Sequence, residues 1–104
     1  MNEIIVLCTV DSAESGERIA AALVESRDAA CVNIISGVRS IYRWEGKLCR
    51  DAEFLLVIKS VADKFEAVRE QIRRMHTYQV PEVIAVPIAF GDADYLSWLR
   101  ESVN

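Results

Sequence analysis

Residues 30–60 read ACVNIISGVRSIYRWEGKLCRDAEFLLVIKS, and this stretch decides the fold. Two runs rich in β-branched and aromatic residues are joined by Glu45 and Gly46, and the glycine supplies the positive φ that a tight hairpin turn needs. The half beside the turn is polar, whereas residues 54–58 are apolar. We therefore predict one long hairpin that extends past its own core. The two-residue turn sets the register, with these facing pairs: Trp44 and Lys47, Tyr42 and Cys49, and Ser40 and Asp51.

Apolar patterns on either side of the hairpin predict the remaining elements. Residues 3–10 are apolar nearly throughout, as in a strand that is buried on both faces. Asp11 and Ser12 can cap a following helix, and Pro87 places the last strand at an edge or a bulge. The expected segments are a strand over 3–10, a helix that ends within 26–29, a helix over 62–76, a strand over 83–88 and a terminal helix that opens at Gly91 and Asp92.

Each expected helix carries an apolar stripe that would face the interior. The stripes are Ile19, Ala20, Leu23 and Val24 in the first helix, Phe65, Val68, Ile72 and Met75 in the second, and Tyr95, Leu96 and Leu99 in the terminal one. The order βαββαβ, followed by a helix, places two crossovers on one face of an antiparallel sheet. We therefore predict a ferredoxin-like α+β fold, as a single domain over residues 1–104.

The composition indicates where apolar surface must be buried. Of the 104 residues, 52% are hydrophobic, above the roughly 45 to 50% usual in soluble domains. No apolar run approaches the roughly 18 residues of a membrane span. The first residues also lack the basic segment, apolar segment and small-residue cleavage site of a secretory signal. We therefore expect a cytoplasmic protein that makes no membrane contact. Subunit contacts are the expected place for the surplus, because the long edge of a projecting arm would otherwise invite aggregation.

Charge and motif content exclude several classes of function. Twelve Lys and Arg against 16 Asp and Glu give a net charge of −4, which opposes binding to nucleic acid and disfavours an RNA-binding domain of the same topology. Three widely spaced cysteines suit free thiols in a reducing compartment. The sequence has no Walker loop, GxGxxG, HExxH or GxSxG string, so an enzyme is disfavoured.

Several strings together resemble the CutA family of divalent-cation tolerance proteins. They are LCT at 7–9, ACVNIISGVRSIYRWEGK at 30–47, EFLLVIK at 53–59, HTYQVPEVIAVPI at 76–88 and GDADYLSWL at 91–99, and they cover nearly the whole chain. The resemblance implies a tight homotrimer, joined by the long hairpins and the strand edges. It also implies a similarity of build to trimeric nitrogen-signalling regulators, which hold small ligands in clefts between subunits.

In its bacterial members the family is linked to tolerance of copper and other divalent ions. The resemblance implies metal contacts at Cys8 and at His76. The chain departs from the family pattern next to that histidine: Met75 replaces a second histidine of some members, Thr77 replaces a proline and Gln79 replaces a glutamate. A set of Cys, Met and His would favour Cu(I), since soft sulfur donors select that ion.

Each candidate metal residue also has a structural interpretation. Cys8 lies in an apolar run and can be a core residue, because reactivity requires an accessible thiolate. His76 falls at a helix end, where it can act as a cap or as a ligand. Met75 continues the apolar stripe of its helix, so core packing competes with a role as a sulfur ligand. Glu82, after a proline, can face solvent or a cleft between subunits.

Further candidates belong to a cleft or an interface. Tyr42 and Trp44 alternate onto one face of the hairpin and are expected to anchor a subunit contact more than a ligand platform. The cations Arg39, Arg43 and Lys59 can form a cationic wall, a solvated strand face or ion pairs between subunits. Tyr78, within the matched string at 76–88, is assigned to the same cleft or interface group.

Two functional hypotheses follow from these residues. The first is a homotrimer that binds copper or another divalent cation weakly and contributes to the response to metal ions. The second is a trimeric signalling or scaffold module whose clefts hold a small anion or a partner protein, with metal binding incidental.

Overall fold

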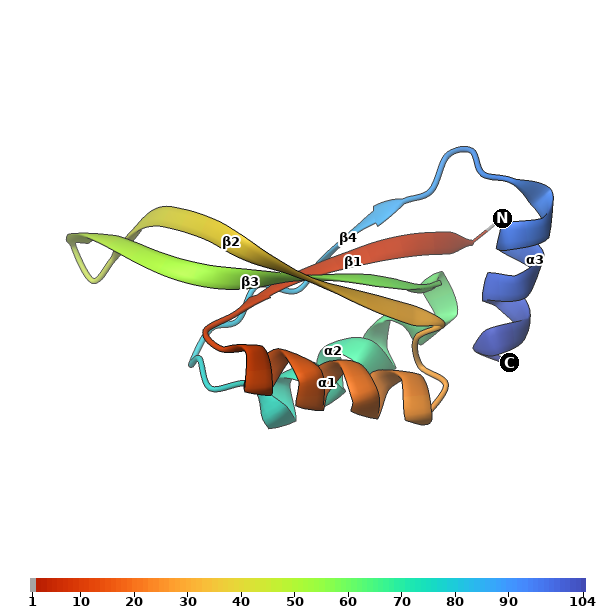
Figure 1. The fold of residues 1–104 in the computed structure, drawn as a ribbon, viewed down its shortest axis with the longest axis horizontal. Helices are drawn as coiled ribbons and strands as arrows, with labels where there is room; N and C mark the ends of the chain where they lie inside the picture. Colours follow the sequence, from red (N-terminus) through yellow and green to blue (C-terminus); the bar gives the residue numbers. More distant parts are fainter. Residues whose placement is uncertain (1) are drawn as a thin grey trace.

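The computed structural model describes residues 2–104 as a four-stranded sheet with three α-helices (Figure 1). The strands are β1 (Glu3–Val10), β2 (Cys31–Trp44), β3 (Lys47–Val61) and β4 (Ile84–Pro87). The helices are α1 (Ala13–Glu25), α2 (Phe65–Met75) and α3 (Ala93–Ser102), and a short 3-10 turn over Ala62–Lys64 precedes α2. The predicted order of elements is confirmed.

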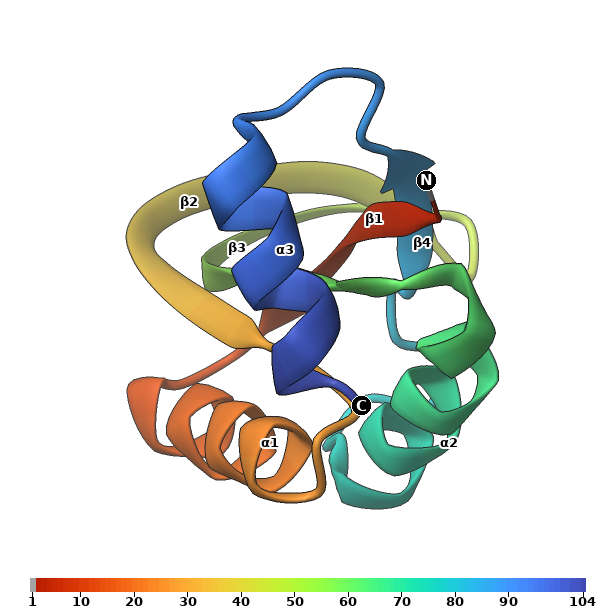
Figure 2. The same cartoon turned by 90° about the vertical axis from the view of Figure 1, so that its right-hand side faces the viewer.

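The sheet has the strand order β2-β3-β1-β4, and every pairing is antiparallel. Because β4 pairs only with β1, Pro87 lies on an edge strand, as predicted. Helices α1 and α2 lie side by side on one face of the sheet, whereas α3 stands at the end where β1 begins (Figure 2). The sequence prediction of an α+β fold with two crossovers on one face is therefore correct.

The main core lies between the sheet and the two crossover helices. Alternate residues of β1 and β3 are buried there against the apolar stripes of α1 and α2, because successive side chains of a strand point to opposite faces. The fully buried members include Val6, Cys8, Leu56 and Ile58 from the strands and Ile19, Leu23, Val68 and Ile72 from the helices. Met75 is partly buried against the same cluster, which is consistent with a packing role.

Helix α3 closes one end of the molecule through a smaller cluster. Leu99 and Val103 are buried against Ala30, with Val61 and Ile88 alongside. Ser12 and Asp92 cap α1 and α3, each accepting a backbone N–H three residues on. Two predictions of inward-facing residues are wrong: Val24 and Tyr95 are exposed, because α1 is packed on one side only and Tyr95 lies against Trp98 on the outer side of α3.

The hairpin of β2 and β3 makes the molecule long, 45 Å against 25 and 22 Å, because it projects beyond the helices (Figure 1). The predicted register is confirmed from Trp44 opposite Lys47 to Val38 opposite Glu53. Glu45 and Gly46 both have positive φ, 50° and 79°, as a two-residue turn of type I′ requires. An irregularity between Ile35 and Val38 shifts the register by one residue at Gly37.

Several helix and strand boundaries differ from the prediction by a few residues, and the hairpin strands run over 31–61 in place of 30–60. The first helix ends at Glu25, and the second begins with a 3-10 turn and ends at Met75, one residue before the predicted end. The last strand is one residue shorter than predicted at each end, Ile84–Pro87, although the backbone N–H of Ile88 still donates to the Glu3 carbonyl at 3.0 Å. The terminal helix begins at Ala93, after its Asp92 cap.

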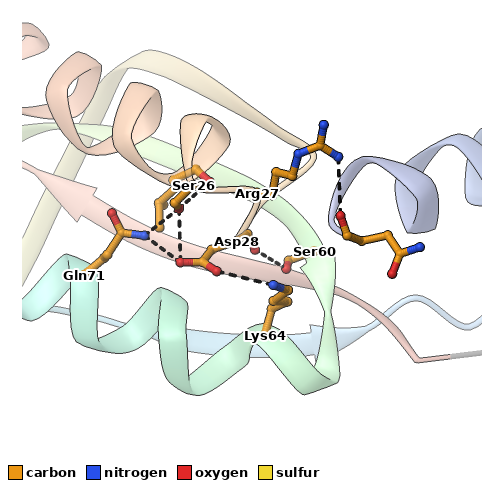
Figure 3. A network of polar contacts seen from close by, with 8 residues as sticks. Ser26, Arg27, Asp28, Ser60, Lys64 and Gln71 are labelled. Atoms are coloured by element: carbon orange, nitrogen blue, oxygen red, sulfur yellow. Dashed lines mark hydrogen bonds and ion pairs between the residues drawn. The ribbon is translucent and has the colours of Figure 1, made fainter.

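One polar network joins the end of α1 to α2 and β3 (Figure 3). The carboxylate of Asp28 accepts hydrogen bonds from Gln71 Nε2 at 2.7 Å and Ser26 Oγ at 3.1 Å, and lies 3.6 Å from Lys64 Nζ. Ser60 Oγ donates to the Asp28 carbonyl at 2.5 Å. Because the Asp28 side chain is only 15% exposed, these donors compensate most of its lost hydration.

Candidate functional site

The sheet face opposite α1 and α2 is left largely without cover. In the middle of β1 and β3 the residues on this face, such as Leu7 and Val57, are half-buried, whereas their neighbours on the helix side are buried. We call it the uncovered face; it comprises Ile5, Leu7, Thr9, Cys31, Asn33, Ile35, Leu55, Val57, Lys59, Ile84 and Val86. Most of these side chains are apolar, and Ile35, Ile84 and Val86 are exposed. Part of the surplus of hydrophobic residues therefore lies on the uncovered face.

The projecting half of the hairpin carries different chemistry on its two faces. Strand alternation places Tyr42 and Trp44 on one face, continuous with the uncovered face, and Tyr42 Oη donates a hydrogen bond to Asp51 there. The opposite face continues the helix side of the sheet beyond the helices. We call it the arginine face; it consists of Arg39, Ile41, Arg43, Leu48, Arg50 and Ala52.

The loop after α2 is fastened to the sheet through His76 and Tyr78. The backbone N–H of Tyr78 donates to His76 Nδ1 at 3.0 Å, so that nitrogen is the acceptor and the proton lies on Nε2. Nε2 then donates to the carbonyl of Thr9, at the end of β1, at 2.8 Å. The ring is therefore a neutral clamp between the loop and β1, and both nitrogens are engaged. His76 also caps α2 with its backbone N–H, bonded to Ile72.

Tyr78 links the same loop to a buried carboxylate of β3. Its hydroxyl donates to Glu53 Oε2 at 2.5 Å, and its ring lies 4.6 Å from the ring of His76, centroid to centroid. Glu53 is only 6% exposed. Burial, together with this hydrogen bond and the charge of Glu53, raises the pKa of Tyr78, so the phenol stays protonated and remains the donor.

Glu82 lies in the same loop and is exposed. Partial desolvation and then the negative charge of Glu53 raise its pKa above the ordinary value. The negative charge of Glu53 that raises the pKa of Glu82 also attracts a cation to this loop, because a cation offsets the repulsion that Glu82 feels. Within residues 2–104, however, no three His, Cys, Asp or Glu side chains are grouped so that they could hold a metal ion.

Cys8 lies in the main core with an exposure of 0%. Burial, and to a smaller extent the charges of Glu82 and Glu53, raise the pKa of its thiol to about 12. The thiol therefore stays protonated near neutral pH, whereas metal ligation needs the thiolate. The structure supports the core interpretation of this residue.

The predicted site residues fall into three separate places. His76, Tyr78 and Glu82 lie together in the loop after α2, with Cys8 and Met75 packed in the core beside it. Arg39 and Arg43 lie on the arginine face, apart from Tyr42 and Trp44. Lys59 lies on the uncovered face, where its ammonium donates to Asn33 Oδ1, so the three predicted cations do not form one wall.

Two residues of these sites were missed by the sequence reasoning. Glu53 precedes an apolar run, and no local pattern indicated its hydrogen bond with Tyr78, 25 positions away. Arg50 was recognised only as part of the polar half, although the register already places it opposite Ile41 and on the face of Arg39. Strand alternation was the signal that could have found it.

The fold and the site define an α+β protein whose four-stranded antiparallel sheet is covered by helices on one face. A sequence model of the family described as CutA1 divalent ion tolerance protein matches residues 4–102. The divalent-cation tolerance protein CutA of Thermus thermophilus is 50% identical over 102 residues, which cover 98% of this chain and 99% of that protein. The chain therefore belongs to the CutA1 divalent ion tolerance family, as the matched strings predicted.

Solved structures agree with this assignment. CutA from Xylella fastidiosa has a TM-score of 0.97 at 34% identity, and the match covers 100% of both chains. A periplasmic divalent cation tolerance protein CutA from Archaeoglobus fulgidus has a TM-score of 0.95 at 38% identity, covering 98% of this chain and 99% of that one. In the described part of this chain, no helix is long and apolar enough to cross a membrane.

Proposed function

We propose that this protein acts in tolerance to divalent metal ions as a cytoplasmic homotrimer with a binding role and no catalytic one. Family membership supports the role in tolerance. The uncovered face supports self-association, because a contiguous apolar sheet surface in a small acidic chain is a typical subunit contact. The projecting arm extends this surface, and on it Tyr42 and Trp44 are both exposed and suited to anchor a neighbouring subunit.

The metal contact that we propose is weak and lies at the loop after α2. Copper or another divalent cation would be attracted by the carboxylate of Glu82 and by the charge of Glu53 that acts on it. His76 could join only by releasing the N–H of Tyr78 from Nδ1, because both ring nitrogens are engaged. Cys8 and Met75 were predicted as sulfur ligands; to reach an ion they would have to leave the core.

Calorimetric titration of the reduced protein with Cu(I) and Cu(II) tests this proposal. We expect Glu82→Gln to weaken binding at least about 10-fold, the loss typical when groups that support a metal site are removed. Glu101→Gln, the same change at an exposed glutamate of α3, should leave the affinity unaltered. Cys8→Ala should also bind like the wild type, because its thiol is buried and protonated. Equal affinities in the wild type and the Glu82 variant would refute a contact at this loop.

A second candidate function is a trimeric module that binds a small anion, with metal binding incidental. The arginine face is the observation that favours it, since three guanidinium groups gather there in a chain of net charge −4.

A further inference from the structure

We propose that the arginine face of the hairpin binds a small organic phosphate. This proposal names the ligand class of the second candidate function. It rests on the proposed trimer in one respect only, the accessibility of this face in the assembled protein.

The register brings the three guanidinium groups within reach of a common ligand. Arg39 lies opposite Ala52, Arg43 lies opposite Leu48, and Arg50 lies opposite Ile41. Arg50 is therefore the diagonal neighbour of both other arginines, at a separation of roughly 7 to 8 Å, which long side chains span. A phosphate between Arg50 and one neighbour can accept paired hydrogen bonds from two planar forks, the geometry for which arginine is preferred.

Within the described chain none of these three guanidinium groups is already paired. Among residues 2–104, no hydrogen bond or ion pair engages the guanidinium of Arg39, Arg43 or Arg50. The nearest acid along the chain, Asp51, points to the opposite face and accepts a hydrogen bond from Tyr42. Asp51 also lines the groove described below, but its carboxylate is engaged by Tyr42, so the three guanidinium groups stay free to bind an anion.

A groove beside the arginines indicates that the ligand is more than an inorganic ion. Its volume is about 380 Å³, and it is lined by Arg39, Ser40, Ile41, Arg50, Asp51 and Ala52. Volumes of this order are typical of small-molecule sites. Ile41 is 64% exposed, and Leu48 on the same face is 56% exposed. An apolar group next to the phosphate would cover these side chains, since contact removes both surfaces from water.

The arginine face stays available in the proposed trimer. It continues the helix side of the sheet, whereas the trimer is proposed to bury the opposite, uncovered face. Successive side chains along a strand point to opposite faces, so a subunit contact can bury one face of the hairpin and leave the other exposed.

Titration calorimetry with phenyl phosphate as the probe tests the proposal on the wild type and two matched variants. Arg50→Gln removes the central cation, and Arg74→Gln makes the same charge change at an exposed position of α2. We expect saturable binding to the wild type and to Arg74→Gln, and at least about 10-fold weaker binding to Arg50→Gln, the loss of one charge-assisted bond. Inorganic phosphate should bind more weakly than phenyl phosphate.

Three results would overturn the proposal. The first is that the wild type shows no saturable binding of phenyl phosphate, and the second is that both variants bind it equally more weakly. The third is that the protein floats with vesicles containing an anionic phospholipid although it does not bind phenyl phosphate. The last result would assign the face to a membrane surface instead. Sedimentation velocity on the same samples reports the oligomeric state, so a missing trimer is recognised separately from a missing phosphate site.

Discussion

A charge placed on the uncovered face should dissociate the proposed trimer. Ile84 is the residue of choice, because it lies on the edge strand β4 and is 52% exposed in the single subunit. Replacing it by Asp therefore costs the subunit itself little, whereas a self-associated face would enclose the new carboxylate among apolar residues such as Leu7, which faces Ile84.

The magnitude follows from the exposure of this side chain. Full burial of an isoleucine contributes about 1.5 to 3 kcal/mol, and the half that is still exposed in the subunit corresponds to roughly 1 kcal/mol at the contact. An uncompensated buried carboxylate costs a further 3 to 5 kcal/mol, approximately. The sum, about 4 to 6 kcal/mol for each contact, corresponds to a dissociation constant raised by about 10³-fold or more.

Sedimentation velocity, with circular dichroism to verify folding, measures the effect. The wild type should sediment at about three times the subunit mass of 11.7 kDa, and Ile84→Asp as a folded monomer. Val24→Asp is the matched control, because Val24 is 43% exposed on α1, which packs on the opposite face of the sheet. A wild-type monomer, a trimeric Ile84→Asp, or equal dissociation of both variants would refute the reasoning.

Two further predictions concern stability. Asp28→Asn should lower the free energy of unfolding by about 1.5 to 3 kcal/mol, because it weakens charge-assisted hydrogen bonds such as that from Gln71. The control Asp63→Asn, at an exposed position, should change it by less than about 0.5 kcal/mol. Denaturant unfolding of both variants and the wild type at one protein concentration measures the difference. Partial desolvation and Glu53 raise the pKa of Glu82 above 4.5, so the folded state holds this proton more tightly than the unfolded state, and stability should fall as pH rises past that value. Glu82→Gln should lack this fall and match the wild type at low pH; parallel pH profiles of the two proteins would contradict it.

Local patterns were sufficient to predict most of the fold. The turn at Glu45 and Gly46 fixed the hairpin register, because a two-residue loop leaves only one pairing of the flanking residues. Pro87 indicated an edge strand, because its nitrogen cannot donate to a second neighbour. The orientation of Tyr95 was predicted wrongly, because α3 lies at the end of the sheet and buries a narrower stripe than periodicity suggested.

The candidate site was much less predictable than the fold. The matched strings marked His76 and Tyr78, yet the clamp they form joins them to Thr9 and Glu53, which are 67 and 25 positions away. Such contacts depend on the path of the loop across the end of the sheet, and no local pattern encodes that path. The first strand shows the same limit: its sequence predicted burial on both faces, whereas packing buries the face of Cys8 and leaves Ile5, Leu7 and Thr9 half-buried.

The sequence by itself determined the order of elements, the hairpin and its register, and the family, because helix periodicity, strand alternation and turn chemistry act between near neighbours. Only the tertiary structure decided which face of each strand is covered. The docking of α1 and α2 on one side buried the thiol of Cys8 and left the opposite face largely without cover. It also left the arginines of the projecting arm without partners in the described chain, because the helices end before the arm begins.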